Sequence, residues 1–179
     1  MRRASKKPGA RLVTFLKALP AGASILELGT GGGQDARFML DQGFEITPSD
    51  GSPELAAEAG RLLGRPVRIL RFDALAIEES FDGVYANAAL LHAPRAALTG
   101  ILARIHHALK PQGLFWASYK AGDAEGHDAL GRYYNYLDAP GLSRHYAEAA
   151  AWSSIEIDAW DGSGYDDQPT KWLGVTARK

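Results

Sequence analysis

The sequence predicts a single three-layer α/β domain with a mostly parallel sheet and an antiparallel C-terminal strand. Three observations lead to this prediction. Short apolar segments alternate with amphipathic helical segments over the first two thirds of the chain, as in successive β–α–β units. A glycine-rich turn directly follows the first predicted strand. The last two apolar segments have no helix between them, so we expect them to pair as an antiparallel hairpin.

The first half of the chain supplies two predicted strands and three predicted helices. A short helix is expected first, because apolar residues recur at the spacing of one helical face over residues 12–19. A buried strand follows at residues 24–28, and then a helix at residues 34–42. A second strand is predicted for residues 44–47. The next helix begins after Ser52, a good N-cap before a proline and an acid, and runs to about residue 63.

The middle of the chain completes the parallel part of the predicted sheet. Residues 67–71 and 81–86 are the third and fourth strands. The clearest helix covers residues 94–109, because a proline opens it and its apolar residues form one stripe. Residues 114–119 form the fifth strand. Since these strands are separated by crossover segments, we expect them to run parallel.

The last third of the chain departs from this alternation. Residues 120–150 are predicted to form a lid-like insertion plus a helix, and the helix covers about residues 140–151. Two further strands follow at residues 155–160 and 171–177. The loop between them is rich in glycine and aspartate, which favours a hairpin connection.

Length and composition are those of one ordinary globular domain. The chain has 179 residues, of which 46% are hydrophobic, and a formal net charge of −1. No repeat or linker divides it, so we expect residues 1–179 to form one domain after a basic flexible tail at residues 1–10. The near-neutral charge argues against a nucleic-acid partner. The absence of cysteine excludes disulfides, cysteine-ligated metals and cysteine nucleophiles.

The sequence also bears on location, metals and assembly. No uninterrupted apolar segment follows the basic N-terminus, and none approaches the roughly 18 residues that a membrane span needs. We therefore expect a cytoplasmic protein with no membrane partner. No His, Asp and Glu cluster has the spacing of metal ligands, so no metal is expected. The expected oligomeric state is a monomer or a homodimer.

The glycine-rich loop at residues 29–33 is the first candidate binding site. Its backbone can approach a ligand closely, and the helix behind it presents free N–H groups. NAD is one possible ligand, but the dinucleotide fingerprint has a third glycine where this chain has Gln34. Glu27 lies two residues before the first glycine, where a carboxylate suits a ligand with a cationic end. Asp50 follows Gly31 by 19 positions and could accept the ribose hydroxyls of either cofactor.

Together with four later motifs, these residues resemble the class I, Rossmann-like, seven-stranded S-adenosylmethionine-dependent methyltransferases. Residues 27–33, Glu-Leu-Gly-Thr-Gly-Gly-Gly, are similar to the E/D-x-G-x-G-x-G signature of that family. The later motifs occur in the family's order at residues 50–53, 71–74, 81–87 and 109–113. The family's seventh strand lies antiparallel between the fifth and sixth, which fits the predicted hairpin. The resemblance covers about residues 12–179.

The resemblance implies transfer of a methyl group from S-adenosyl-L-methionine, which leaves as S-adenosyl-L-homocysteine. It also implies a set of cofactor-binding residues on loops at the ends of the predicted strands. They are Glu27, Gly29, Thr30, Gly31, Asp50, Gly51, Ser52, Asp73, Ala74 and Asn87. In that set Asp50 would hold the ribose and Asp73 would meet adenine, while Asn87 would line the opening toward the methyl acceptor.

His92 and Tyr134 are the candidate catalytic residues. His92 lies near the end of the fourth strand, where a neutral imidazole could take a proton from the acceptor, or could only pack. Tyr134 belongs to an aromatic run at residues 133–136 that could form a lid, or could simply pack on the sheet. Arg95 is interpreted as a solvated first-turn residue. Candidates for the acceptor wall are Tyr119, Lys120, Tyr165 and Trp172.

We expect a small-molecule acceptor with an O, N or S nucleophile. Residues 87–90 lack the Asn/Asp-Pro-Pro-aromatic motif of enzymes that methylate exocyclic amines of bases, and the chain adds only a short lid to the core fold. Three alternatives stay open. The chain could be a non-catalytic S-adenosylmethionine-binding module, an NAD-dependent oxidoreductase, or an RNA methyltransferase with a basic face.

Overall fold

The computed structural model describes residues 8–127, 131–164 and 168–179. Residues 1–7 of the predicted tail and Tyr165 lie outside the described residues. The main sheet has seven strands. They are β1 (Ser24–Leu28), β2 (Glu45–Asp50), β3 (Arg68–Ile69), β4 (Phe81–Ala86), β5 (Leu109–Lys120), β8 (Ser154–Ser163) and β9 (Pro169–Arg178). Two further strands, β6 (Glu125–His127) and β7 (Tyr133–Asn135), form a small sheet of their own.

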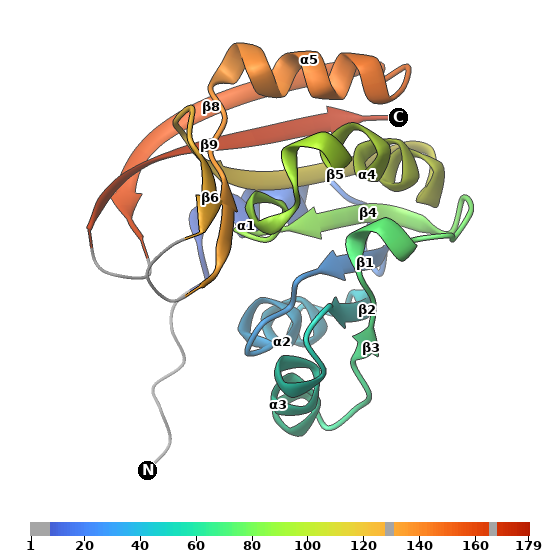
Figure 1. The fold of residues 1–179 in the computed structure, drawn as a ribbon. Helices are drawn as coiled ribbons and strands as arrows, with labels where there is room; N and C mark the ends of the chain where they lie inside the picture. Colours follow the sequence, from blue (N-terminus) through green and yellow to red (C-terminus); the bar gives the residue numbers. More distant parts are fainter. Residues whose placement is uncertain (1–7, 128–130, 165–167) are drawn as a thin grey trace.

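The order of the main sheet is β3-β2-β1-β4-β5-β9-β8. The neighbouring strands from β3 to β5 pair in parallel, whereas β9 is antiparallel to both β5 and β8 (Figure 1). The hairpin of β8 and β9 therefore inserts its second strand between β5 and its first strand. This arrangement confirms the predicted Rossmann-like α/β fold, including its antiparallel C-terminal strand.

Helices cover both faces of the sheet. They are α1 (Ala10–Lys17), α2 (Gln34–Asp41), α3 (Pro53–Leu63), α4 (Arg95–Ala108) and α5 (Ala139–Ala149), with short 3₁₀ helices η1 (Phe72–Ala74) and η2 (Leu90–His92). One buried cluster joins α1, α2 and α3 to the sheet, and a second joins α4 and α5 to the opposite face. Because α1 begins at Ala10, the last residue of the predicted tail is helical.

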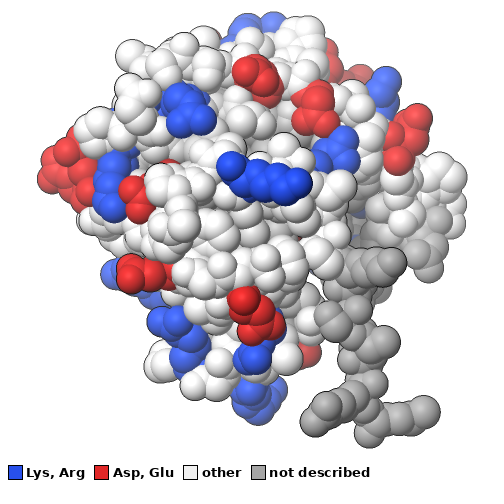
Figure 2. Space-filling view, turned by 180° about the vertical axis from the view of Figure 1, so that it is seen from behind, with Lys and Arg blue, Asp and Glu red and all other residues white. Residues whose placement is uncertain are grey.

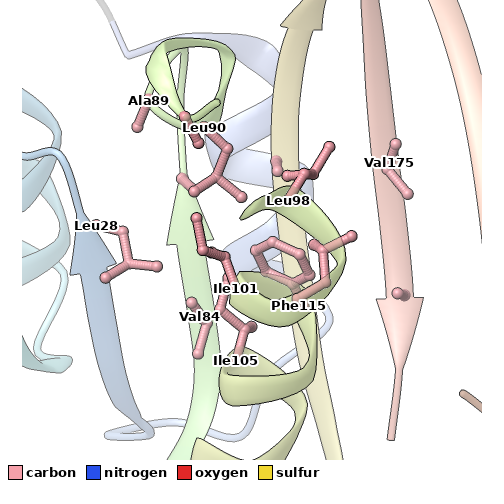
Figure 3. Packing of buried hydrophobic residues seen from close by; sticks show 14 of the residues in the cluster. Leu28, Val84, Ala89, Leu90, Leu98, Ile101, Ile105, Phe115 and Val175 are labelled. Atoms are coloured by element: carbon pink, nitrogen blue, oxygen red, sulfur yellow. The ribbon is translucent and has the colours of Figure 1, made fainter. Parts of the chain in front are cut away.

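Side chains along the central strands alternate between the two faces of the sheet, and this alternation builds the two buried clusters. On β4, Val84 belongs to the α4 cluster and its neighbour Tyr85 to the α1 cluster. On β5, Phe115 and Trp116 divide between the clusters in the same way. Figure 3 shows Val84 and Phe115 packed against Ile101 and other apolar residues of α4. The period of two in a strand thus places consecutive side chains in different layers.

Several boundaries differ from the predicted ones. β2 continues to Asp50 because its pairing with β1 carries on past Pro48. β3 has only two residues, since it lies at the edge of the sheet and the chain turns at once into η1. The predicted lid-like insertion contains β6 and β7, for which no strands were predicted and which pair antiparallel. Ser52 caps α3 as expected, because its hydroxyl accepts from the amide of Leu55 at 3.3 Å.

Among the described residues, no helix is both long enough and apolar enough to cross a membrane. On the face drawn in Figure 2, Lys and Arg side chains are interspersed with Asp and Glu side chains. That face therefore lacks the concentrated positive charge that a nucleic-acid-binding surface presents.

Candidate active site

The carboxyl ends of β1, β2 and β4 border a cleft of about 620 Å³. Parallel α/β sheets bind ligands at this edge, where the loops that follow the strands meet. Most of the predicted cofactor residues line the cleft. They are Glu27, Gly29, Thr30, Gly31, Asp50, Gly51 and Asn87, and His92 lines it as well.

The glycine loop is held closely between its neighbours. Gly29 has a φ of 71°, and a Cβ built there would lie 2.6 Å from the Cβ of Ala89. Only glycine therefore fits without strain at this position. The amide of Thr30 donates to the carbonyl of Ser49 at 2.8 Å, so the loop is also tied to the end of β2.

Asp50 is fixed in orientation by two backbone amides. The amide of Gly31 donates to its Oδ2 and the amide of Ser52 to its Oδ1, both at 2.9 Å. The carboxylate is buried yet lines the cleft. Each of its oxygens keeps a second lone pair, so Asp50 can still accept hydroxyl groups from a ligand. Ser52 acts here through its backbone.

Glu27 is a buried carboxyl at the floor of the cleft, with 3% of its surface exposed. Burial raises its pKa to about 8, and the nearby acids Asp35 and Asp50 add to this rise. A hydrogen bond from the hydroxyl of Thr30 opposes it. A ligand cation beside Glu27 would restore the ionised form, because an opposite charge favours the carboxylate. The site therefore fits a ligand with a cationic end, such as an ammonium or sulfonium group.

Asn87 belongs to a polar network that sequence reasoning did not predict. Its amide nitrogen donates to Asp35 at 3.1 Å, and its side-chain oxygen accepts from the hydroxyl of Ser118 at 2.9 Å. Ser118 in turn accepts from the amide of Ala88 at 2.7 Å. The network fixes the loop after β4, in which Ala88 has a positive φ of 51°. The only signal for Asp35 in the sequence is its position, as an acid in the first turn of α2.

A second, smaller cavity of about 220 Å³ adjoins the cleft. Gly51, Phe72 and His92 line both spaces, and the remaining lining is largely apolar. Asp73 lines the small cavity, but Arg71 pairs with it at 3.0 Å and lowers its pKa. Ala74 is exposed and lines neither space. Phe72, which the sequence analysis did not single out, lies where the flat apolar part of a ligand would fit.

His92 connects the cleft to the β6–β7 hairpin. Its Nδ1 donates to the carbonyl of Tyr133 at 2.8 Å, because a carbonyl can only accept. In the neutral imidazole this leaves Nε2 as the basic nitrogen. The ring of Tyr134 packs on the His92 ring with centroids 4.7 Å apart. Tyr134 is itself buried and lines neither cavity, so it contacts the site through His92.

Arg95 holds the hairpin, and its interpretation as a solvated residue was wrong. Its Nε donates to the side-chain oxygen of Asn135 at 2.9 Å, and its Nη2 donates to the carbonyl of Tyr136 at 2.8 Å. Its backbone amide donates to Glu125 at 3.0 Å. These partners lie 30 or more residues away in the sequence, which is why local pattern could not reveal them.

Tyr119 also differs from its prediction as part of the acceptor wall. Its side chain is 1% exposed and belongs to the core between the sheet, α4 and α5. Its hydroxyl pairs with that of Tyr146 on α5 at 2.9 Å. Burial raises the pKa of Tyr119 well above its usual range. The residue therefore supports the packing of α5 on the sheet.

Comparisons with known proteins agree with this geometry. The family model described as a methyltransferase domain matches residues 1–155. The ubiquinone biosynthesis O-methyltransferase of Xanthomonas oryzae pv. oryzae is 32% identical over 166 residues, which cover 83% of this chain and 68% of that protein. An uncharacterized methyltransferase of Synechocystis is 30% identical over 100 residues, or 55% of this chain. The match covers 47% of the Synechocystis protein, about half its length.

Solved structures of methyltransferases also superpose on this chain. The 1,6-didemethyltoxoflavin-N1-methyltransferase of Burkholderia thailandensis, solved with S-adenosylhomocysteine, superposes with a TM-score of 0.77 at 27% identity, covering 99% of this chain and 79% of that one. A methyltransferase of Methanosarcina mazei gives a TM-score of 0.83 over 97% of this chain and 99% of that one. Its 13% identity supports the fold alone. The expected enzyme class and cofactor are confirmed at the level of the family, and the chain belongs to the class I S-adenosylmethionine-dependent methyltransferases.

Proposed function

We propose that this protein transfers a methyl group from S-adenosylmethionine to an O, N or S atom of a small molecule. One observation carries the proposal: Glu27 and Asp50, at the ends of adjacent strands, line one cleft of about 620 Å³. A buried carboxyl with a raised pKa suits the cationic end of the cofactor, and an oriented carboxylate suits its ribose. The adjoining cavity beside Phe72 has room for a flat base.

The protein's own part in the reaction is mainly alignment and proton removal. The bound cofactor supplies an activated methyl group. Asp50 orients the ribose hydroxyls, and ionised Glu27 holds the cationic end. Nε2 of His92 takes the proton of the acceptor when its nucleophile carries one. Tyr134 keeps the His92 ring in place, since the two rings are packed together.

The size of the site favours a small acceptor. The β6–β7 hairpin adjoins the cleft, because the carbonyl of Tyr133 accepts from His92, which lines the cleft. Arg95 anchors this hairpin to the start of α4. A hairpin in this position can cover a small molecule and exclude water from it. The mixed charges on the face in Figure 2 give no support to a nucleic-acid acceptor.

Calorimetric titration with S-adenosylmethionine, S-adenosylhomocysteine and NAD tests the cofactor site. We expect both adenosyl ligands to bind and NAD not to bind. Asp50→Ala should weaken adenosyl binding at least tenfold, because a charged hydrogen-bond acceptor is worth about 1.5–3 kcal/mol. Asp41→Ala is the matched control, since Asp41 is exposed at the end of α2 and pairs with Arg37. Binding of NAD alone would refute the proposal.

Turnover is tested separately by the release of S-adenosylhomocysteine. A panel of small phenols, amines and thiols is incubated with the protein and S-adenosylmethionine. We expect product from at least one class, and loss of most turnover in His92→Gln when the nucleophile must lose a proton. Tight cofactor binding without turnover of any acceptor would favour a non-catalytic binding module.

A further inference from the structure

Lys120 is a half-buried lysine at the carboxyl end of β5, on the same edge of the sheet as the cleft. Its ammonium lies 4.9 Å from the ring centre of Tyr134 and 5.8 Å from that of Trp172. Tyr134 in turn packs on His92, which lines the cleft. Lys120 is therefore separated from the candidate base by a single aromatic ring.

Lys120 differs from the other partly buried lysines in its partners. Lys110 pairs with Asp82 at 3.0 Å, and Lys179 pairs with Glu79 at 3.3 Å. Within the part of the chain that the structure describes, Lys120 has no carboxylate partner and only aromatic ones. Aromatic faces attract the ammonium but leave its charge uncompensated. A half-buried positive charge of this kind attracts an anion more strongly than a solvated one.

We propose that Lys120 binds an anionic group of the methyl acceptor, and that the acceptor is a small carboxylic acid. This inference rests on the proposed methyltransferase function. The carboxylate lies against the Lys120 ammonium, beside the half-buried indole of Trp172. The nucleophilic atom of the same molecule then reaches toward His92 and the cleft. Tyr134 sets the spacing between the two ends, because it contacts both Lys120 and His92.

Pairs of acids and their methyl esters test this inference. The probes are 3,4-dihydroxybenzoate, 4-aminobenzoate and 3-mercaptobenzoate, each with its methyl ester. Binding to protein saturated with S-adenosylhomocysteine is measured by calorimetry. At least one acid should bind roughly 10- to 100-fold more tightly than its ester, because a hydrogen bond between charged groups is worth about 1.5–3 kcal/mol. Lys120→Met should abolish this preference, and Lys120→Arg should keep part of it.

Lys171→Met is the matched control, because Lys171 is an exposed lysine next to Trp172 on β9. It should leave the preference for the acid unchanged. For an acid that is turned over, Lys120→Met should raise KM with little change in kcat, since Lys120 does not touch the reacting atoms. Equal binding of every acid and its ester, or an unchanged preference in Lys120→Met, would overturn the inference. Failure of the wild-type protein to bind S-adenosylhomocysteine would instead count against the proposed function.

Discussion

Glu27→Gln replaces a buried carboxyl by a neutral group of nearly the same shape. In the folded protein the pKa of Glu27 is about 8, against a usual value of 4.5, and burial is the main cause. The folded state therefore holds this proton more tightly than the unfolded chain does. Consequently stability falls as the pH rises from about 4.5 to about 8, and the loss is complete above that range. The neutral amide of the variant does not titrate, so it contributes no such dependence.

The expected magnitude follows from the difference between the two pKa values. A pKa difference of one corresponds to about 1.4 kcal/mol, so Glu27 lowers the free energy of unfolding by roughly 3 kcal/mol between pH 5 and pH 8. The stability of Glu27→Gln relative to the wild type should therefore increase by that amount over this interval. Urea unfolding of the ligand-free proteins at both pH values measures the difference, and the contributions of groups that do not interact with Glu27 cancel.

Glu45→Gln is the control for this experiment, because Glu45 is exposed at the start of β2. As an exposed substitution it should change the urea midpoint little. A stability difference between Glu27→Gln and the wild type that does not change with pH would refute the reasoning. The same variant should bind S-adenosylmethionine more weakly than the wild type does, since it lacks a carboxylate to face the cationic end.

Two further perturbations follow from the packing of the site. Gly29→Ala should lower the free energy of unfolding by about 2 kcal/mol or more, because the new Cβ is placed at a positive φ and 2.6 Å from a neighbouring Cβ. Gly32→Ala, where nothing lies within 4 Å, should change stability little, and equal urea midpoints for the two variants would contradict the packing argument. Arg95→Met should increase hydrogen exchange in β6 and β7 while leaving β1 unchanged, because it removes the side-chain bonds that hold the hairpin. Unchanged protection of the hairpin would show that other contacts hold it.

The sequence by itself determined the fold and several of the residues that line the cleft. Strand and helix periodicities place buried residues correctly because each depends on positions close in the chain. Gly29 and Asp50 could be found for the same reason, since the glycine loop and the end of β2 are local features of a β–α–β unit. Boundaries such as those of β3 could not be predicted, because an edge strand ends where its single neighbour stops pairing.

The tertiary structure alone decided the environment of these residues. Arg95, Asp35 and Ser118 gain their roles from partners that are distant in the sequence. The raised pKa of Glu27 likewise depends on how much surrounding chain excludes water from it. Lys120 has an ordinary sequence context, and only the placement of two aromatic rings and the lack of a carboxylate partner among the described residues set it apart. Burial and charge pairing are properties of the packed molecule, so a linear pattern does not contain them.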